Sequence, residues 1–337
     1  MEKRDPVLLV TGRDIFPENR RVFNTGISLL GIVSIFSVVF FPYSNNEIFI
    51  NSMKEAQANS GAITGSVLET TSNFQESNNM IEYLTTESDK LRNGLIATLL
   101  LHEFGHYAVA LLSNLKVSFP TIIPNPVTGV TTTINRINEP FPTRQDLLNF
   151  AVAGPLLGMV SSIFLLYVGL AITPNTKEAL PFLPLVPISL LKMSTLASGL
   201  VDSVLGSGFV EGFQSESEGK LVPLSPFAIA GFYGMIVNAL SMIPFGKTDG
   251  GRTATALFGR SGALSIGYLP VFASLYLITK YQDTTSATLF IPAFLYISTF
   301  QNEQELPCRN EVDEPDIFSS LIAGFAWFLM VLILTPV

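Results

Sequence analysis

Long apolar runs separated by polar segments dominate the chain, and they predict membrane-spanning helices. About 20 mainly apolar residues are enough to cross the hydrocarbon core of a bilayer. Full-length or somewhat shorter runs of this kind lie at 22–41, 93–113, 147–172, 225–243, 264–278, 287–300 and 317–334. A weaker run at 182–201 contains Lys192 and several prolines, and it predicts a membrane-adjacent or re-entrant segment. The pattern predicts an all-α polytopic membrane protein with about six to eight transmembrane helices.

The segment 116–142 departs from this helical pattern. Its β-branched run at 127–134 is interrupted by Gly129 and bounded by prolines, so a short β-rich loop is expected near 117–140. An exposed strand edge in this loop would suit an unwound peptide, which could add to it as a further strand. Because β-propensity alone is weak, a structured loop that contacts no substrate is an equal alternative.

A polar connection at 42–92 divides the chain into two predicted parts. It contains seven acidic and three basic residues and is rich in Ser, Thr and Asn. This composition predicts a weakly structured or amphipathic-helical segment on the translocated side of the membrane. The predicted parts are therefore 1–92, with the N-terminal tail, first span and acidic connection, and a membrane domain at 93–337.

Composition supports the membrane class and excludes others. Hydrophobic residues make up 48% of the chain and charged residues only 14%, with a mean hydropathy of +0.43, whereas globular domains are about one quarter charged. The lipid bilayer is thus an expected partner. A pI near 4.9 gives no basic surface for nucleic acid. The single cysteine, Cys308, cannot form an internal disulfide, and no targeting segment is readable at the N-terminus.

The distribution of basic residues predicts the orientation of the spans. Five of the 19 lysines and arginines lie in the first 21 residues, which places that end on the cytoplasmic or equivalent side. The spans at 93–113 and 225–243 would then both run toward this side, since basic residues follow each of them. Their inner ends are expected to approach the same face of the membrane.

Both histidines of the chain lie within one apolar run, LLLHEFGHYAVALL. Residues four apart project from nearly the same face of a helix, so His102 and His106 can hold one metal ion between them. Glu103 is placed to act on a water molecule at that metal, as in the H-E-x-x-H helix of zinc hydrolases. Ionisable groups inside a span are costly and usually functional. The alternative is a pair of structural histidines, hydrogen-bonded within a helix bundle, with Glu103 paired to one of them.

A catalytic zinc site needs a third protein ligand, which we expect to be a carboxylate. There is no third histidine, Cys308 lies in a polar loop, and the residues after His106 offer no acid. Asp249, in NALSMIPFGKTDGGRTATALFG, is the one acidic residue close to the inner end of an apolar span. A proline and three glycines around it permit tight turns toward the metal. The alternative is an ordinary turn aspartate before glycine.

HEFGH together with NALSMIPFGKTDGGR resembles the site-2 proteases, a family of intramembrane zinc metalloproteases. The stretches AVAGPLLG, SPFAIAGFYG and PCRNEVDEPD look like the plastid and cyanobacterial branch, the ethylene-dependent gravitropism-deficient and yellow-green proteases. The resemblance extends from Arg92 to the C-terminus. One departure is Thr248 before the aspartate, where the family commonly has leucine.

The resemblance implies that His102, His106 and Asp249 bind Zn²⁺, that Glu103 is the catalytic base, and that Asn238 helps to position substrate or the oxyanion. It makes 93–337 an intramembrane metalloprotease domain that hydrolyses transmembrane protein substrates. It also implies a plastid location, thylakoid or inner envelope, or a cyanobacterial membrane. Every ligand position is kept, which favours an active enzyme. The alternatives are an inactive membrane scaffold of the same family and a metal-ion transporter.

Overall fold

The computed structural model is mainly helical, and it describes residues 21–43, 50–51, 54, 67–137, 139–173, 183–206, 221–281 and 305–337. Its main helices are α1 (Arg21–Phe40), α3 (Val67–Leu112), α4 (Arg144–Ala171), α6 (Thr195–Leu205), α8 (Pro226–Ser241), α9 (Asp249–Tyr281) and α11 (Ile317–Leu334). Short helical segments are η2 (Phe41–Tyr43) and α5 (Ile188–Leu191). Two small antiparallel sheets pair β1 (Thr121–Asn125) with β2 (Gly129–Ile134) and β3 (Leu185–Pro187) with β4 (Leu221–Pro223).

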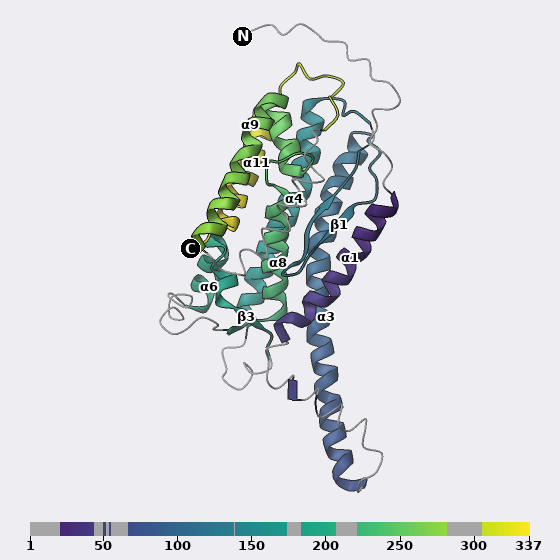
Figure 1. Ribbon diagram of the computed structural model, residues 1–337, viewed down its shortest axis with the longest axis vertical. Helices are drawn as coiled ribbons and strands as arrows, with labels where there is room; N and C mark the ends of the chain where they lie inside the picture. Colours follow the sequence, from purple (N-terminus) through teal and green to yellow (C-terminus); the bar gives the residue numbers. More distant parts are fainter. Residues whose placement is uncertain are drawn as a thin grey trace.

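The core of the molecule is a bundle of α3, α4 and α8, with α9 and α11 on one side and the β1–β2 hairpin and α1 on the other (Figure 1). Nearly every residue of α8 is buried. Small residues allow α8 to approach α4 closely, because a Cβ added at Gly231 would lie 2.7 Å from the Cα of Leu166. Close backbone approach at small residues is typical of helix packing in membranes.

The predicted β-rich loop near 117–140 is confirmed as the β1–β2 hairpin, and α1 covers one of its edges. Ser28 of α1 accepts a hydrogen bond from the backbone N–H of Ile122 at 3.2 Å, and Ser34 donates to the carbonyl of Asn125 at 2.9 Å. The helix can lie this close because a Cβ at Gly31 would be 2.7 Å from the carbonyl oxygen of Ile122. The outer edge of β1 is therefore occupied by α1, and β2 faces the helical core.

Within the described residues, four helical stretches are long and apolar enough to cross a membrane: Val22–Val39, Thr85–Leu112, Arg144–Ala171 and Ile317–Leu334. They correspond to four of the predicted spans. The run at 225–243 forms the shorter α8, of 16 residues. The run at 264–278 lies in α9, which contains a kink at Gly259 (φ 71°). The run at 287–300 falls outside the described residues, so the total of about six to eight spans stays a prediction.

Two segments for which the sequence left more than one form open have a definite form in the structure. The helix α3 has 46 residues and already begins at Val67, so helix continues through the second half of the predicted polar connection and across the expected boundary at 92–93. The segment at 182–201, predicted to be membrane-adjacent or re-entrant, contains the short strand β3, the helix α5 and the first part of α6. A three-residue strand such as β3 gives no period-two pattern from which it could be recognised.

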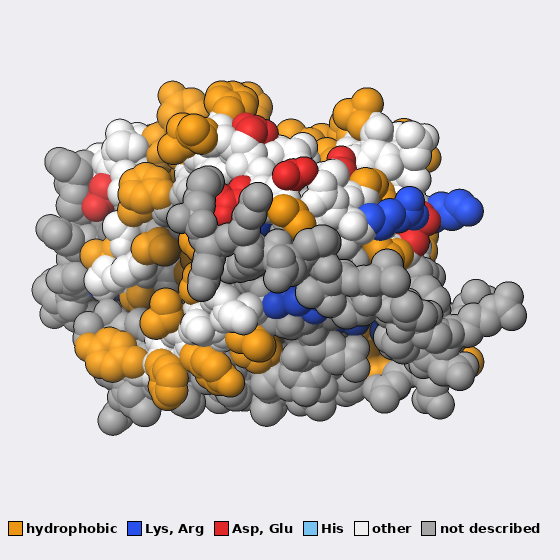
Figure 2. Space-filling view, turned by 90° about the horizontal axis from the view of Figure 1, so that it is seen from above, with side chains coloured by type: hydrophobic (Ala, Val, Ile, Leu, Met, Phe, Trp, Pro, Cys, Tyr) orange, Lys and Arg blue, Asp and Glu red, His pale blue; other side chains and the backbone are white. Residues whose placement is uncertain are grey.

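Hydrophobic and charged side chains are distributed as a bilayer requires. Large apolar side chains are exposed along the flanks of the helices, including Leu100, Phe104, Phe164 and Leu321. The segment before α11 exposes Glu311, Asp313, Glu314 and Asp316. Seen from above, hydrophobic side chains gather along part of the rim of the molecule, and acidic side chains lie among them (Figure 2).

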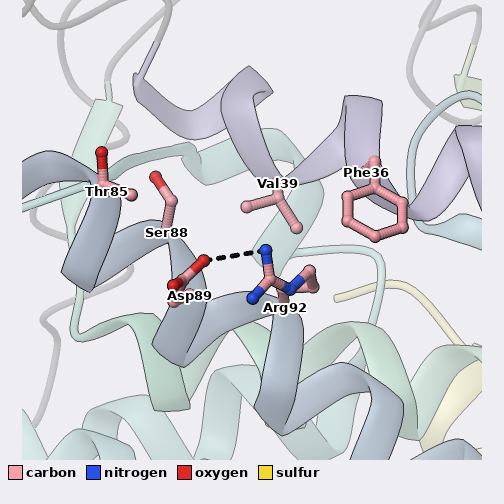
Figure 3. Close-up of a pocket in the computed structure, with 6 residues that line it drawn as sticks. All are labelled: Phe36, Val39, Thr85, Ser88, Asp89 and Arg92. Carbon is pink, nitrogen blue, oxygen red and sulfur yellow. Dashed lines mark ion pairs between the residues drawn. The ribbon is translucent and has the colours of Figure 1, made fainter.

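A pocket lies between α1 and α3, near the start of the apolar part of α3 (Figure 3). Its lining residues are Phe36, Val39, Thr85, Ser88, Asp89 and Arg92. Arg92 pairs with Asp89 at 2.8 Å and lies over the ring of Phe36 at 5.5 Å. The histidine motif is ten or more residues further along the helix, a rise of about 15 Å or more, so this pocket is separate from the metal centre.

Candidate metal centre

His102, His106 and Asp249 come together in a buried cluster where α3 meets the first turn of α9. The Nε2 atoms of the two histidines are 3.1 Å apart. Oδ2 of Asp249 lies 3.6 Å from Nε2 of His102 and 3.4 Å from Nε2 of His106. All three residues are less than 5% exposed. Residues from two distant parts of the chain thus direct three donor atoms at one point.

Each histidine is oriented by a hydrogen bond at its other ring nitrogen. Nδ1 of His102 is 2.7 Å from Oδ1 of Asn238, and Nδ1 of His106 is 2.8 Å from the carbonyl oxygen of Phe150. The amide orientation of Asn238 follows from its Nδ2, which donates to the carbonyl of Gly234 at 2.6 Å. Both partners of the rings are acceptors, so both Nδ1 atoms carry the proton. The two Nε2 atoms of the neutral rings are then left with lone pairs that face each other.

Glu103 lies on the same turn of α3 and is held on one side only. Its Oε2 accepts a hydrogen bond from Nδ2 of Asn135 at 2.9 Å. Its Oε1 is buried and has no hydrogen-bond partner among the described residues. The hydrogen bond goes to Asn135 and not to a histidine, which differs from the structural alternative in which Glu103 pairs with one of the imidazoles.

Asp249 is the first residue of α9, and the residues around it fix the start of that helix. The hydroxyl of Thr248 accepts the N–H of Gly251 at 3.0 Å, as an N-cap does. Gly251 has to be glycine because a Cβ there would lie 2.6 Å from the carbonyl oxygen of Phe245. Gly246 adopts a positive φ of 55° in the preceding turn. Threonine at 248 therefore supplies a helix cap that a leucine could not.

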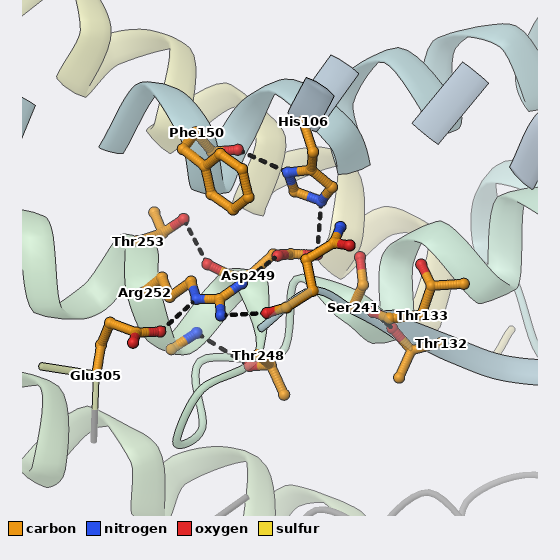
Figure 4. A network of polar contacts seen from close by, with 12 residues as sticks. His106, Thr132, Thr133, Phe150, Ser241, Thr248, Asp249, Arg252, Thr253 and Glu305 are labelled. Atoms are coloured by element: carbon orange, nitrogen blue, oxygen red, sulfur yellow. Dashed lines mark hydrogen bonds and ion pairs between the residues drawn. The ribbon is translucent and has the colours of Figure 1, made fainter. Parts of the chain in front are cut away.

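Arg252 connects Asp249 to the rest of the site (Figure 4). This buried guanidinium lies 3.6 Å from Oδ1 of Asp249, donates to Oε2 of Glu305 at 2.7 Å, and donates to the backbone carbonyl of Asn135 at 2.6 Å. It also lies over the ring of Phe150, which stacks on His106. Two carboxylates around one arginine keep this buried charge compensated.

Several residues of this environment were not identified from the sequence: Asn135, Phe150, Gly154, Gly158, Arg252 and Glu305. The stretch AVAGPLLG carries a partial signal, because small residues in a membrane span allow helices to pack closely. Gly154 and Gly158 do face neighbours, and a Cβ at these positions would overlap the ring of His106 and the amide of Asn238. The Asn135–Arg252–Glu305 contacts join positions far apart in the chain, and no local spacing encodes them.

The donor set fits zinc. Two imidazole nitrogens and a carboxylate oxygen at about 2.0–2.1 Å from a tetrahedral ion would be about 3.3 Å apart. The observed separations of 3.1, 3.4 and 3.6 Å lie around this value. Oδ2 of Asp249 is buried without a hydrogen-bond partner among the described residues, which is unfavourable unless a cation is bound there. The ligand assignment itself is a proposal.

The fold and the site define a mainly helical protein with candidate membrane spans and a buried His-His-Asp cluster that could hold a metal ion, and comparison with known proteins gives its family. Residues 92–269 match the model of Peptidase family M50. The match covers more than half of the chain, so the protein belongs to this family. Zinc is the cofactor that the family and the His-His-Asp cluster imply.

The chain is similar to plant proteins of this family. It is 30% identical over 250 residues to the probable zinc metalloprotease EGY1, chloroplastic, of Arabidopsis thaliana, covering 73% of this chain and 42% of that protein. EGY2 of Arabidopsis thaliana is 29% identical over 250 residues, which are 74% of this chain and 42% of EGY2. EGY3 of the same plant is 24% identical over 236 residues, 66% and 38% of the two chains. The chain thus spans about two fifths of the length of these relatives. No solved structure matches it.

Proposed function

We propose that the protein is an intramembrane zinc metalloprotease that hydrolyses peptide bonds in membrane-embedded protein substrates. The observation that carries the proposal is the buried triangle of His102, His106 and Asp249, together with Oε1 of Glu103, on the same turn of α3, which is buried without a hydrogen-bond partner among the described residues. Zinc bound there would supply a Lewis acid that polarises the scissile carbonyl and strengthens water as a nucleophile.

The protein's own residues would move the protons. Oε1 of Glu103 takes a proton from the attacking water as the new C–O bond forms. The same carboxyl then gives that proton to the leaving amine as the C–N bond breaks, so it ends the cycle ionised. Asn238 holds His102, and the carbonyl of Phe150 holds His106. The amide oxygen of Asn238 already accepts the hydrogen bond from His102, so positioning of substrate or the oxyanion would be a second role of this residue.

A substrate helix must unwind before its backbone can react, because its carbonyls are occupied by intrahelical hydrogen bonds. We propose that the unwound segment adds to the edge of β2 that does not pair with β1 and that faces the helical core. Two facts support this choice. The outer edge of β1 already bonds to Ser28 and Ser34 of α1. The strand β2 leads directly into Asn135, which donates to Glu103.

The location is also a proposal. The relatives are described as chloroplastic, and the orientation predicted from the basic residues would put the metal centre near the stromal or cytoplasmic face. A plastid membrane, thylakoid or inner envelope, or a cyanobacterial membrane fits both.

Purified protein and a panel of single-span membrane proteins in detergent micelles test the function. Cleavage should disappear when zinc is removed with a chelator and return when zinc is restored. Intact panel proteins under all conditions would favour the scaffold, and zinc uptake into sealed vesicles containing the protein would favour the transporter.

A further inference from the structure

Asn135 fixes one oxygen of the proposed general base. It directly follows β2, is only 3% exposed, and donates from Nδ2 to Oε2 of Glu103 at 2.9 Å. The other oxygen, Oε1, receives no hydrogen bond from a described residue. A carboxylate held at one oxygen cannot rotate freely about its terminal torsion. The free oxygen therefore has a defined direction.

The backbone of Asn135 is fixed in turn by Arg252. The guanidinium donates from Nη2 to the carbonyl of Asn135 at 2.6 Å, and its Nη1 lies 3.6 Å from Oδ1 of Asp249. Glu305 accepts from Nε at 2.7 Å and holds the guanidinium in place. Oδ1 is the Asp249 oxygen that does not face the histidines. One buried arginine thus contacts both the residue that holds the base and the carboxylate of the third proposed ligand.

We propose that Asn135 is a positioning residue for Glu103, and that Arg252 sets its position relative to Asp249. This inference rests on the proposed protease function and deepens it. A misplacement of about 1 Å at a reacting group can cost about a hundredfold in rate, so fixing the carboxylate is worth a dedicated side chain. Because Asn135 directly follows β2, the strand proposed to align the substrate also leads into the residue that aligns the base.

The variants Asn135→Ala and Asn135→Asp test the role of the amide donor. Aspartate matches asparagine in shape but offers an acceptor to Glu103 in place of a donor. The matched control is Asn125→Ala in the same hairpin, where Oδ1 accepts the N–H groups of Val127 and Thr128 at 2.8 and 3.2 Å. The control disturbs the hairpin turn without touching Glu103.

The kinetic experiment uses the panel protein that the wild type cuts fastest, with zinc content measured on each preparation. Both Asn135 variants should keep a full equivalent of zinc and an unchanged KM, while kcat falls about tenfold to a hundredfold. Asn125→Ala should keep a near wild-type kcat. Wild-type kcat in Asn135→Asp would overturn the proposal, and so would an equal loss of kcat in the Asn125 control.

A second readout does not depend on activity. The thermal unfolding midpoints of the wild type, Asn135→Ala, Glu103→Ala and the double variant form a cycle in which contacting side chains give non-additive changes. We expect each substitution to lower the unfolding midpoint less when the other substitution is already present than it does in the wild type. Additive midpoints would overturn the contact. If the wild type cuts no panel protein but the cycle is non-additive, the protease proposal fails while the Asn135–Glu103 contact stands.

Discussion

Gly154 of α4 lies directly against the imidazole of His106 on α3, where a Cβ would overlap the ring atoms. The imidazole cannot easily move away from Gly154, because Phe150 holds it in two ways. The carbonyl of Phe150 accepts a hydrogen bond from Nδ1 of His106, and the phenyl ring of Phe150 stacks on the imidazole with the ring centroids 4.6 Å apart. Close packing and metal binding therefore depend on the same glycine.

We predict that Gly154→Ala weakens zinc binding by at least about tenfold, because His106 must turn away from Asp249. Gly324→Ala in α11 is the matched control, since no atom lies within 4 Å of its added Cβ. Zinc affinities measured by competition with a coloured chelator compare the two. Equal affinities in both variants would show that α3 and α4 can separate at no cost to the site.

A second prediction concerns the ligands themselves. The protein should bind one zinc per chain, and His102→Ala and Asp249→Asn should each lose it, since a neutral amide is a poorer zinc ligand than a carboxylate. Elemental analysis of folded protein gives the stoichiometry. A full equivalent of zinc in both variants would mean that the ligand assignment is wrong.

Asn238 should affect zinc through His102. Removing the acceptor of a ligating histidine typically weakens metal binding about tenfold to a hundredfold, and we expect this for Asn238→Ala. Asn238→Asp should retain more affinity, because its carboxylate can still accept from Nδ1. Asn149→Ala, at an exposed position of α4, controls for the loss of an amide. Unchanged zinc affinity in both Asn238 variants would mean that Asn238 acts on substrate alone.

The parts of this site that the sequence predicts are those with local spacing. His102 and His106 are four residues apart on one helix, and Asp249 lies at the end of an apolar run, so periodicity and position were enough to nominate them. The hairpin was expected because β-branched residues between prolines disfavour helix. Each of these signals is contained in one short window of the chain.

The remaining features depend on packing between distant segments. Asn135, Arg252 and Glu305 belong to a hairpin, a helix and a loop, and each is unremarkable in its own window. The carbonyl of Phe150 is a backbone group that no side-chain pattern identifies. In the sequence, Thr248 differs from the family only by replacing a leucine. Its role as a helix cap follows from the hydrogen bond that its hydroxyl accepts from the N–H of Gly251.

Topology can be tested with introduced cysteines, because the native thiol should be silent. Cys308 is 8% exposed, and burial raises the pKa of its thiol to about 12. Since the thiolate is the reactive form, little of it is present near neutral pH, and the wild type should resist an impermeant maleimide until unfolded. Rapid labelling of the folded wild type would contradict this.

Cysteines at Ser60 and Ser261 should then label from opposite sides of sealed vesicles. The first position lies in the acidic connection and the second in α9, beyond the basic residues near the metal centre. Basic segments stay on the cytoplasmic side, whereas the acidic connection is translocated. Labelling of both cysteines from the same side would refute the predicted orientation.

The decisive substitution is Glu103→Gln. Glutamine nearly matches glutamate in size, and its side-chain oxygen can still accept from Asn135, so α3 and the three ligands should be undisturbed. It cannot take a proton from water at the free position, and loss of a general base typically costs about a hundredfold to ten-thousandfold in rate. We therefore expect a full equivalent of zinc and almost no cleavage in the same preparation, whereas Asp249→Asn should lose both.

Loss of zinc together with activity in Glu103→Gln would leave a structural role for Glu103 open, and the matched preparations are needed for this reason. Cleavage near the wild-type rate with zinc bound would remove Glu103 from the reaction. Because Oε1 of Glu103 and Oδ2 of Asp249 are the two buried carboxylate oxygens without a hydrogen-bond partner among the described residues, the two variants separate proton transfer from metal binding. Only a hydrolase requires both, since a scaffold would tolerate either change and a transporter would depend on Asp249 alone.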